Sequence, residues 1–172
     1  MEDGGWRMNV ETLKGNTVLV VDDKLENLDI LINYLSMTFG FTILVAQDGQ
    51  KAISLAEQFM PDIILLDIMM PGIDGFETCR RLKVNETTKK IPIIFMTALT
   101  DIDSKVKGFE AGGVDYVTKP IELQEVSARI TTHLTLYNLQ RELEARNREL
   151  DTFGHRAHRG VRGGKRGHQT AH

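Results

Sequence analysis

The sequence predicts an α/β domain built on a doubly wound parallel sheet of five strands, followed by a C-terminal helical extension. Short apolar runs alternate with stretches of helical spacing, and polar side chains suited to chemistry follow the ends of several runs. Strands that alternate with helices imply right-handed crossovers and a sheet covered on both faces. The 172 residues allow one domain of ordinary size plus an appendage.

The five expected strands are continuous apolar runs rather than alternating ones, as strands buried on both faces require. They are Thr17–Val21, Phe41–Ala46, Ile63–Leu66, Ile91–Met96 and a weaker run, Val114–Val117.

The intervening stretches carry apolar residues at helical spacing. Two have a clear stripe, formed by Leu28, Leu31, Ile32 and Leu35 and by Ala52, Leu55, Ala56 and Phe59. Residues 76–82 and 106–110 predict two more helices with mixed faces. Pro61 and Pro71 fall between elements, as helix breakers do.

Composition excludes several classes of protein. The net charge is −3, but residues 155–172 carry five positive charges and no acid, which leaves −8 for residues 1–154. We therefore do not expect the folded part to bind nucleic acid. The sequence has no run apolar enough to span a membrane and no signal peptide, and its single cysteine, Cys79, excludes internal disulfides and cysteine-built metal sites. These features predict a cytoplasmic protein without a membrane partner.

Polar side chains follow four of the expected strands. Asp22 and Asp23 end the first, Asp67 the third and Thr97 the fourth, and Lys119 and Pro120 come just after the fifth. Because ligands of such sheets bind at the carboxyl ends of the strands, we expect these side chains to converge.

The expected cluster suits phosphoryl chemistry. Asp22, Asp23 and Asp67 placed together require a cation or raised pKa values. Oxygen ligands in an open, wet site suit Mg²⁺. Lys119 adds a positive charge and Thr97 a hydroxyl donor, so the set can hold a phosphoryl group transferred to a carboxylate.

Four motifs identify a resemblance that covers about residues 16–135. VLVVDD (18–23), LLDIMMPGIDGFE (65–77), IIFMTA (93–98) and DYVTKP (115–120) together resemble the response-regulator receiver family of two-component systems. The resemblance implies a flavodoxin-like sheet with strand order 2-1-3-4-5. It also implies phosphorelay signal transduction, with a sensor histidine kinase or a phosphotransfer protein as the partner that supplies the phosphoryl group.

The resemblance assigns the acceptor and the metal ligands. Asp67 would be the phosphoacceptor, and Mg²⁺ would be the cofactor. Asp23, Asp67 and the backbone carbonyl of Met69 would bind the ion directly, whereas Asp22 would act mainly through water. The protein would not be an enzyme beyond its own phosphorylation and slow dephosphorylation.

The resemblance also assigns the switch. Lys119 would pair with the acyl phosphate, Thr97 would move to hydrogen-bond it, and Tyr116 would turn inward behind Thr97. Pro120 would follow a cis peptide bond. Met69 and Leu99 would flank the phosphate, and since apolar side chains cannot orient an attacking water, we predict a long phosphoryl lifetime.

Each of these residues taken singly has a simpler explanation. Asp23 could cap a helix, Asp67 could cap a loop, and Lys119 could be a solvated lysine. Tyr116 could be packing at a strand edge. The four motifs in order favour the receiver interpretation over these alternatives.

Residues 136–154 predict a helical extension with a coiled-coil pattern. A heptad row is formed by Leu136, Leu139, Leu143, Leu150 and Phe153. Arg146 interrupts this row, which spans about two and a half heptads. We expect a parallel homodimer or a signalling helix that leads to another domain. The alternative is a solvated amphipathic helix packed on its own domain.

The last residues leave two interpretations open. NRELDTFGHRAH (147–158) resembles the approach to the dimerisation helix of a histidine kinase, but arginines follow His155 and His158 and no proline follows, which departs from the acceptor pattern. Residues 155–172 are predicted to be a disordered basic tail, either a remnant of a hybrid kinase, which we favour, or a weak RNA-binding tail. Residues 1–15 are predicted to be flexible. A DNA-binding regulator is disfavoured because no output domain is visible.

Overall fold

The computed structural model describes residues 10–98 and 100–161, and contacts divide the chain into two units, Met1–Tyr137 and Asn138–His172. The elements are α1 (Val10–Leu13), β1 (Thr17–Val21), the 3-10 turn η1 (Leu25–Asn27), α2 (Asp29–Phe39), β2 (Thr42–Ala46), α3 (Gly49–Phe59), β3 (Ile63–Asp67), α4 (Gly75–Val84), β4 (Ile93–Thr97), α5 (Ile102–Ala111), β5 (Asp115–Thr118) and α6 (Leu123–Val161).

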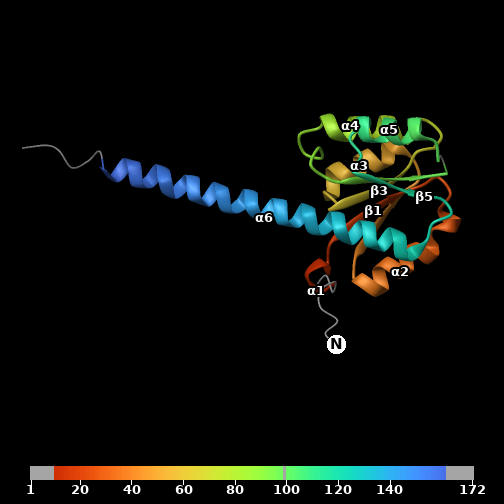
Figure 1. Ribbon diagram of the computed structural model, residues 1–172, viewed down its shortest axis with the longest axis horizontal. Coiled ribbons are helices and arrows are strands. Elements are labelled where there is room, and N and C mark those ends of the chain that lie inside the picture. Colours follow the sequence, from red (N-terminus) through yellow and green to blue (C-terminus); the bar gives the residue numbers. More distant parts are fainter. Residues whose placement is uncertain (1–9, 99, 162–172) are drawn as a thin grey trace, which may run out of the picture. The chain divides into compact units, whose positions relative to one another are not determined.

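The five strands form one parallel sheet in the order β2-β1-β3-β4-β5, which confirms the predicted flavodoxin-like topology. Helices α3, α4 and α5 cover one face of this sheet, and α2 and the first turns of α6 cover the other (Figure 1). In the register of the central strands Val21 lies beside Leu66, and Asp67 lies beside Met96. The ends of β1, β3 and β4 therefore reach the same edge.

The core has two layers, one on each side of the sheet. Leu19, Ile64 and Leu66 pack against the α3–α5 layer. Ile63 and Leu65, their neighbours in β3, point to the layer of α2 and α6. Every residue of β3 and β4 is buried, because successive side chains enter opposite layers. This is the physical reason for the continuous apolar runs in the sequence.

Aspartates fix the starts of three helices. Each accepts a hydrogen bond from a backbone N–H three residues later, at 2.7 Å for Asp48, 2.8 Å for Asp74 and 2.9 Å for Asp101. Such caps satisfy an otherwise unpaired donor and typically contribute about 1 kcal/mol. The cap at Asp74 sets where α4 begins, close to the loop that follows Asp67.

The prediction that residues 1–15 are flexible is wrong from Val10 onward. Helix α1 is ordered, and the side chain of Leu13 is only 3% exposed because it packs in the layer of α2 and α6. The backbone N–H of Gly15 donates to the carbonyl of Gly40 at 3.1 Å. One buried leucine and this bond anchor the segment, whereas residues 1–9 lie outside the described part of the chain.

The predicted C-terminal boundary at residue 154 is also wrong, because α6 continues to Val161. The reason is that the segment contains no proline, and single glycines such as Gly154 and Gly160 each cost a helix only about 1 kcal/mol. Residues 162–172, the rest of the predicted disordered tail, lie outside the described residues.

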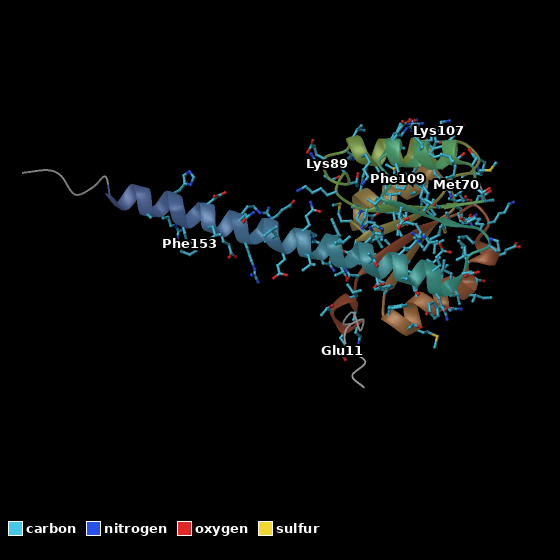
Figure 2. All side chains as sticks on the ribbon, in the orientation of Figure 1. Glu11, Met70, Lys89, Lys107, Phe109 and Phe153 are labelled. Carbon is cyan, nitrogen blue, oxygen red and sulfur yellow. The ribbon has the colours of Figure 1, made fainter. Side chains whose placement is uncertain are left out.

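Within the second unit the structure describes residues 138–161, all of which belong to helix α6. Leu139, Leu143, Leu150 and Phe153 are 57–69% exposed, and Figure 2 labels Phe153 on this helix. Arg146, at the interrupted position, donates to Glu142 at 2.8 Å. No helix among the described residues is long and apolar enough to cross a membrane.

Candidate functional site

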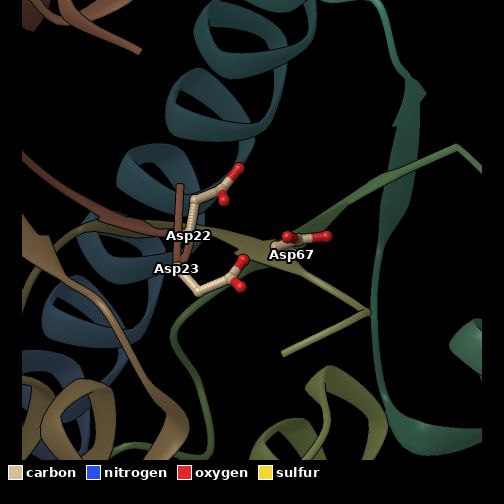
Figure 3. A group of neighbouring side chains, drawn as sticks. All are labelled: Asp22, Asp23 and Asp67. Atoms are coloured by element: carbon tan, nitrogen blue, oxygen red, sulfur yellow. The ribbon is translucent and has the colours of Figure 1, made fainter. Parts of the chain in front are cut away.

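Three carboxylates converge at the carboxyl edge of the sheet. Asp22 and Asp23 follow β1 and Asp67 ends β3, as predicted, and one oxygen of each lies within 4.8 Å of the others (Figure 3). Asp22 is only 2% exposed and Asp67 only 5%. The sheet register therefore collects negative charge where little water can solvate it.

Lys119 is the cation of the cluster. Its Nζ lies 2.9 Å from Oδ2 of Asp22 and 3.1 Å from Oδ2 of Asp67. It reaches them from the turn after β5, whose backbone is fixed because the N–H of Lys119 donates to the carbonyl of Thr97 at 2.8 Å. One ammonium group thus faces two buried carboxylates, with Asp23 beside them.

Backbone hydrogen bonds hold the carboxylates in place. The N–H of Lys24 donates to Oδ1 of Asp22 at 2.8 Å, and the N–H of Met69 donates to Oδ1 of Asp67 at 3.3 Å. These bonds fix one oxygen of each group and leave the other for Lys119. Both carboxylates are therefore tied to the backbone of the loops that carry them.

The pKa values reflect this crowding. Burial raises the pKa of Asp67, Lys119 opposes that effect and the charge of Asp22 adds to it, so the pKa lies above its ordinary value. Burial lowers the pKa of Lys119, but the hydrogen bonds and charges of Asp22 and Asp67 outweigh it and the net pKa is raised. A divalent cation would relieve the remaining excess of negative charge.

The donor set fits Mg²⁺. Its carboxylate oxygens are the hard ligands that this ion prefers, and Mg²⁺ keeps several waters when it binds proteins. An open cavity of about 1180 Å³ gives room for those waters and for a phosphoryl group. Beyond the aspartates and Lys119, it is lined by Lys24, Leu28, Ile68, Met69, Met70, Pro71, Asp74, Phe76, Ala98, Pro120 and Ile121. The side chain of Met69 is 67% exposed and offers the site no polar atom suited to orienting water.

The predicted switch residues lie together at the side of the site. Thr97 ends β4, is 3% exposed, and lines a second, small cavity with Tyr116. The ring of Tyr116 packs edge-on against Phe109 at 6.2 Å, and Nζ of Lys105 lies 4.4 Å above it. The ring therefore packs against side chains of α5.

Two further predictions concern single residues. The peptide bond between Lys119 and Pro120 is cis, in agreement with the prediction for this turn. Leu99, predicted to flank the phosphate, lies outside the described residues.

The sequence reasoning missed a charged cluster that joins the start of β5 to α6. Asp115 accepts hydrogen bonds from Arg129 Nη1 at 2.8 and 2.9 Å, from Nε2 of His133 at 3.0 Å and from the N–H of Tyr116 at 2.8 Å. Arg129 and His133 are four residues apart on α6, so they share a helix face, and this spacing was the signal available in the sequence. The sequence reasoning also gave no role to Gly75.

Comparison with known proteins agrees with this geometry. The sequence pattern of the response regulator receiver domain matches residues 18–131. The chain belongs to the response regulator receiver family. Receiver domains are signalling domains rather than conventional enzymes. They accept a phosphoryl group and bind Mg²⁺ at an acidic pocket, and they interact with histidine kinases or phosphotransfer proteins.

Several curated proteins are similar to this receiver. RpaA, a DNA-binding dual master transcriptional regulator of Synechocystis, is 42% identical over 113 residues, which are 66% of this chain and 46% of RpaA. Response regulator PleD of Caulobacter vibrioides is 42% identical over 132 residues, which are 77% of this chain and 28% of PleD. The chain thus spans less than half the length of these relatives.

Solved structures are similar over about 70% of the chain. A putative response regulator from Chloroflexus aurantiacus is 37% identical with a TM-score of 0.67, covering 71% of this chain and 99% of that one. The signal receiver domain of a signal transduction histidine kinase from Syntrophus aciditrophicus is 29% identical with a TM-score of 0.65, covering 70% and 91%.

Proposed function

We propose that Asp67 accepts a phosphoryl group from a phosphohistidine of a sensor kinase or phosphotransfer protein, and that the phosphorylated receiver then switches conformation. The observation that carries this proposal is the placement of Lys119 between the buried carboxylates of Asp22 and Asp67. Mg²⁺ would bind to Asp23, Asp67 and the carbonyl of Met69, with Asp22 acting through water. The earlier prediction of a cytoplasmic location stays a prediction.

In the proposed reaction an oxygen of Asp67 attacks phosphorus, the phosphorus–nitrogen bond breaks, and its electron pair returns to the imidazole. The chain supplies position and charge, which is most of what phosphoryl transfer requires. Lys119 is already within ion-pair distance of Asp67, so it can pass from that carboxylate to a phosphoryl oxygen. Bound Mg²⁺ would neutralise part of the charge on the transferred group.

The proposed switch uses Thr97 and Tyr116. A hydrogen bond to a charged group contributes about 1.5–3 kcal/mol, so bonds from Thr97 and Lys119 to the phosphoryl group could shift a two-state equilibrium by about two orders of magnitude. Thr97 and Tyr116 line the same small cavity, so movement of the threonine changes the space beside the ring.

The test is incubation with Mg²⁺ and acetyl phosphate, followed by intact mass measurement, on the wild type and on Asp67→Ala. We expect a phosphoryl adduct that requires Mg²⁺ and is absent from the variant. Asp48→Ala removes an exposed aspartate that caps α3, so it serves as the matched control and should still form the adduct. Absence of any Mg²⁺-dependent adduct in the wild type would refute the proposal.

A second proposal concerns the helix of the second unit. We infer that its row of exposed apolar residues, spaced as in a coiled coil, forms a homodimer or a signalling helix. Light scattering with and without beryllofluoride would report the oligomeric state. Leu143→Lys should abolish self-association, whereas Ala145→Lys, on another face of the helix, should leave it unchanged. A wild type that is monomeric in both states would shift the signal to another partner.

The alternative function is the receiver-bearing front of a hybrid histidine kinase. It is favoured by the resemblance of residues 147–158 to the approach to a kinase dimerisation helix, and one similar structure is the receiver domain of a histidine kinase. Sequencing the transcript beyond codon 172 would test it. An in-frame or frame-shifted ATP-binding region would support this alternative, and its absence would favour the switch module.

A further inference from the structure

Gly75, the first residue of α4, lies directly against the backbone of the phosphoacceptor. Its N–H donates to the carbonyl of Ile68 at 2.8 Å. A Cβ added to Gly75 would overlap the carbonyl oxygen of Asp67, and it would lie only 2.7 Å from Cα of Ile68 and 3.0 Å from the carbonyl carbon of Asp67. Glycine is therefore the residue that lets α4 approach this closely.

The atoms that a Cβ at Gly75 would contact belong to the backbone of Asp67 and Ile68, and this determines the effect of a larger residue. A flexible side chain can rotate away from an added methyl group, but the peptide after Asp67 cannot. It is also held from the other side, because the N–H of Ile68 donates to the carbonyl of Met96 at 3.3 Å. Any residue larger than Gly75 must displace either α4 or the loop that carries Asp67.

That loop carries the groups on which the site depends. The Asp67 carboxylate is fixed by the N–H of Met69 at 3.3 Å, and Lys119 must reach the same carboxylate at 3.1 Å. The carbonyl of Met69 is the proposed third ligand of Mg²⁺. A shift of the peptide between Asp67 and Ile68 therefore moves the acceptor and two cation ligands together.

We propose that Gly75 is a positioning residue for phosphoryl transfer: by lacking a side chain, it lets α4 hold the backbone of Asp67 where the carboxylate and the Met69 carbonyl share one cation. The inference rests on the proposed function of Asp67. It assigns Gly75 no contact with the phosphoryl group or the ion. It differs from a role in packing alone because it predicts a loss of cation affinity in a folded protein.

The test compares Gly75→Ala with Gly113→Ala. The control also places a methyl group in a crowded position, 2.8 Å from Cδ2 of Phe95, but that neighbour is a side chain, which can shift, and not the backbone of Asp67. Mg²⁺ affinity is measured by NMR titration of labelled protein. The initial rate of phosphorylation is measured with acetyl phosphate at saturating Mg²⁺, and stability is measured by thermal unfolding. Displacement of reacting groups by about 1 Å can cost up to about a hundredfold.

We expect Gly75→Ala to weaken Mg²⁺ binding and slow phosphorylation by about tenfold each. We expect Gly113→Ala to lower the unfolding temperature with Mg²⁺ affinity within about twofold of wild type. A folded Gly75→Ala with wild-type affinity and rate would overturn the inference. So would an equal loss of affinity in Gly113→Ala, because general destabilisation would then suffice.

A second pair of variants keeps the test decisive if Gly75→Ala does not fold. Asp74→Asn removes the charge and keeps a capping oxygen, whereas Asp74→Ala removes both and loosens the first turn of α4. The inference predicts weaker Mg²⁺ binding in Asp74→Ala than in Asp74→Asn, and equal affinities would contradict it. Failure of the wild type itself to bind Mg²⁺ or form an adduct would instead refute the proposed function.

Discussion

Replacing Lys119 with methionine tests whether this ammonium group holds the acidic cluster together. In the wild type its Nζ lies 2.9 Å from Asp22 and 3.1 Å from Asp67, and the side chains of both aspartates are almost fully buried. Lys119→Met keeps most of the apolar stem and removes the charge. The two carboxylates would then face each other without a protein cation.

The expected cost can be worked from the geometry. Two carboxylate charges within 4.8 Å of each other repel by at least about 3 kcal/mol at an effective dielectric near 20. Removing one partner of a buried ion pair costs about 3–5 kcal/mol, and the lower end applies because the Lys119 side chain is 29% exposed. We therefore expect Lys119→Met to lower the free energy of unfolding by about 3 kcal/mol at pH 7 in EDTA.

Urea unfolding with and without Mg²⁺ provides the assay. Mg²⁺ should restore part of the loss, because a ligand that binds the folded state stabilises it and the variant has more unbalanced charge to neutralise. Lys24→Met, an exposed lysine that lines the same cavity, is the matched control and should change stability by less than about 0.5 kcal/mol. A Lys119→Met protein as stable as wild type in EDTA would show that the carboxylates do not depend on this lysine.

Three further predictions follow from single residues. Met69→Asn should shorten the phosphoryl lifetime several-fold in a phosphate-release assay, because an amide can orient an attacking water; unchanged hydrolysis would argue against a lifetime role for Met69. Burial opposes ionisation of Asp115, but the hydrogen bonds from His133, the N–H of Tyr116 and Arg129 outweigh it and lower its pKa. The stabilisation by ionised Asp115 is fully present above its ordinary pKa of 3.8 and is lost as the pH falls through its lower pKa in the folded state. Asp115→Asn should therefore lower the free energy of unfolding in urea at neutral pH, and the difference from wild type should shrink in acid. A difference that stays constant down to pH 2 would contradict this assignment. Leu65→Ala, at a fully buried position, should lower the free energy of unfolding by about 2–5 kcal/mol with an unchanged urea m-value. A loss below about 1 kcal/mol would contradict this prediction, because it would mean that neighbouring side chains fill the cavity left by Leu65.

Much of the fold was predictable because its central strands β1, β3 and β4 are buried on both faces. The run Thr17–Val21 coincides with β1, and the other four expected strands overlap the observed ones closely. Helix faces were harder to predict. Phe59 completes an apolar stripe in the sequence, yet it is 51% exposed because it lies at the last turn of α3, beyond the cover of its neighbours.

The site was predictable to a similar degree. Asp22, Asp23, Asp67 and Lys119 converge because each follows a strand, and strand ends are visible as abrupt changes of polarity. Gly75 was not predictable as a positioning residue. Its proposed role depends on the lack of a Cβ and on close contact with the backbone of Asp67, and this contact is known only from how α4 packs.

The hydrogen bonds of Asp115 have a consequence for how the first unit opens. One carboxylate accepts hydrogen bonds from β5 itself and from two successive turns of α6, so the strand cannot separate from that helix without breaking the ion pair and hydrogen bonds of Asp115. Local opening in proteins proceeds in cooperative blocks, whose members exchange their amide protons together. Amides at the start of β5 and in the first turns of α6 should therefore exchange with solvent at a common rate, and the strand that carries Tyr116 and the helix that follows it form one foldon.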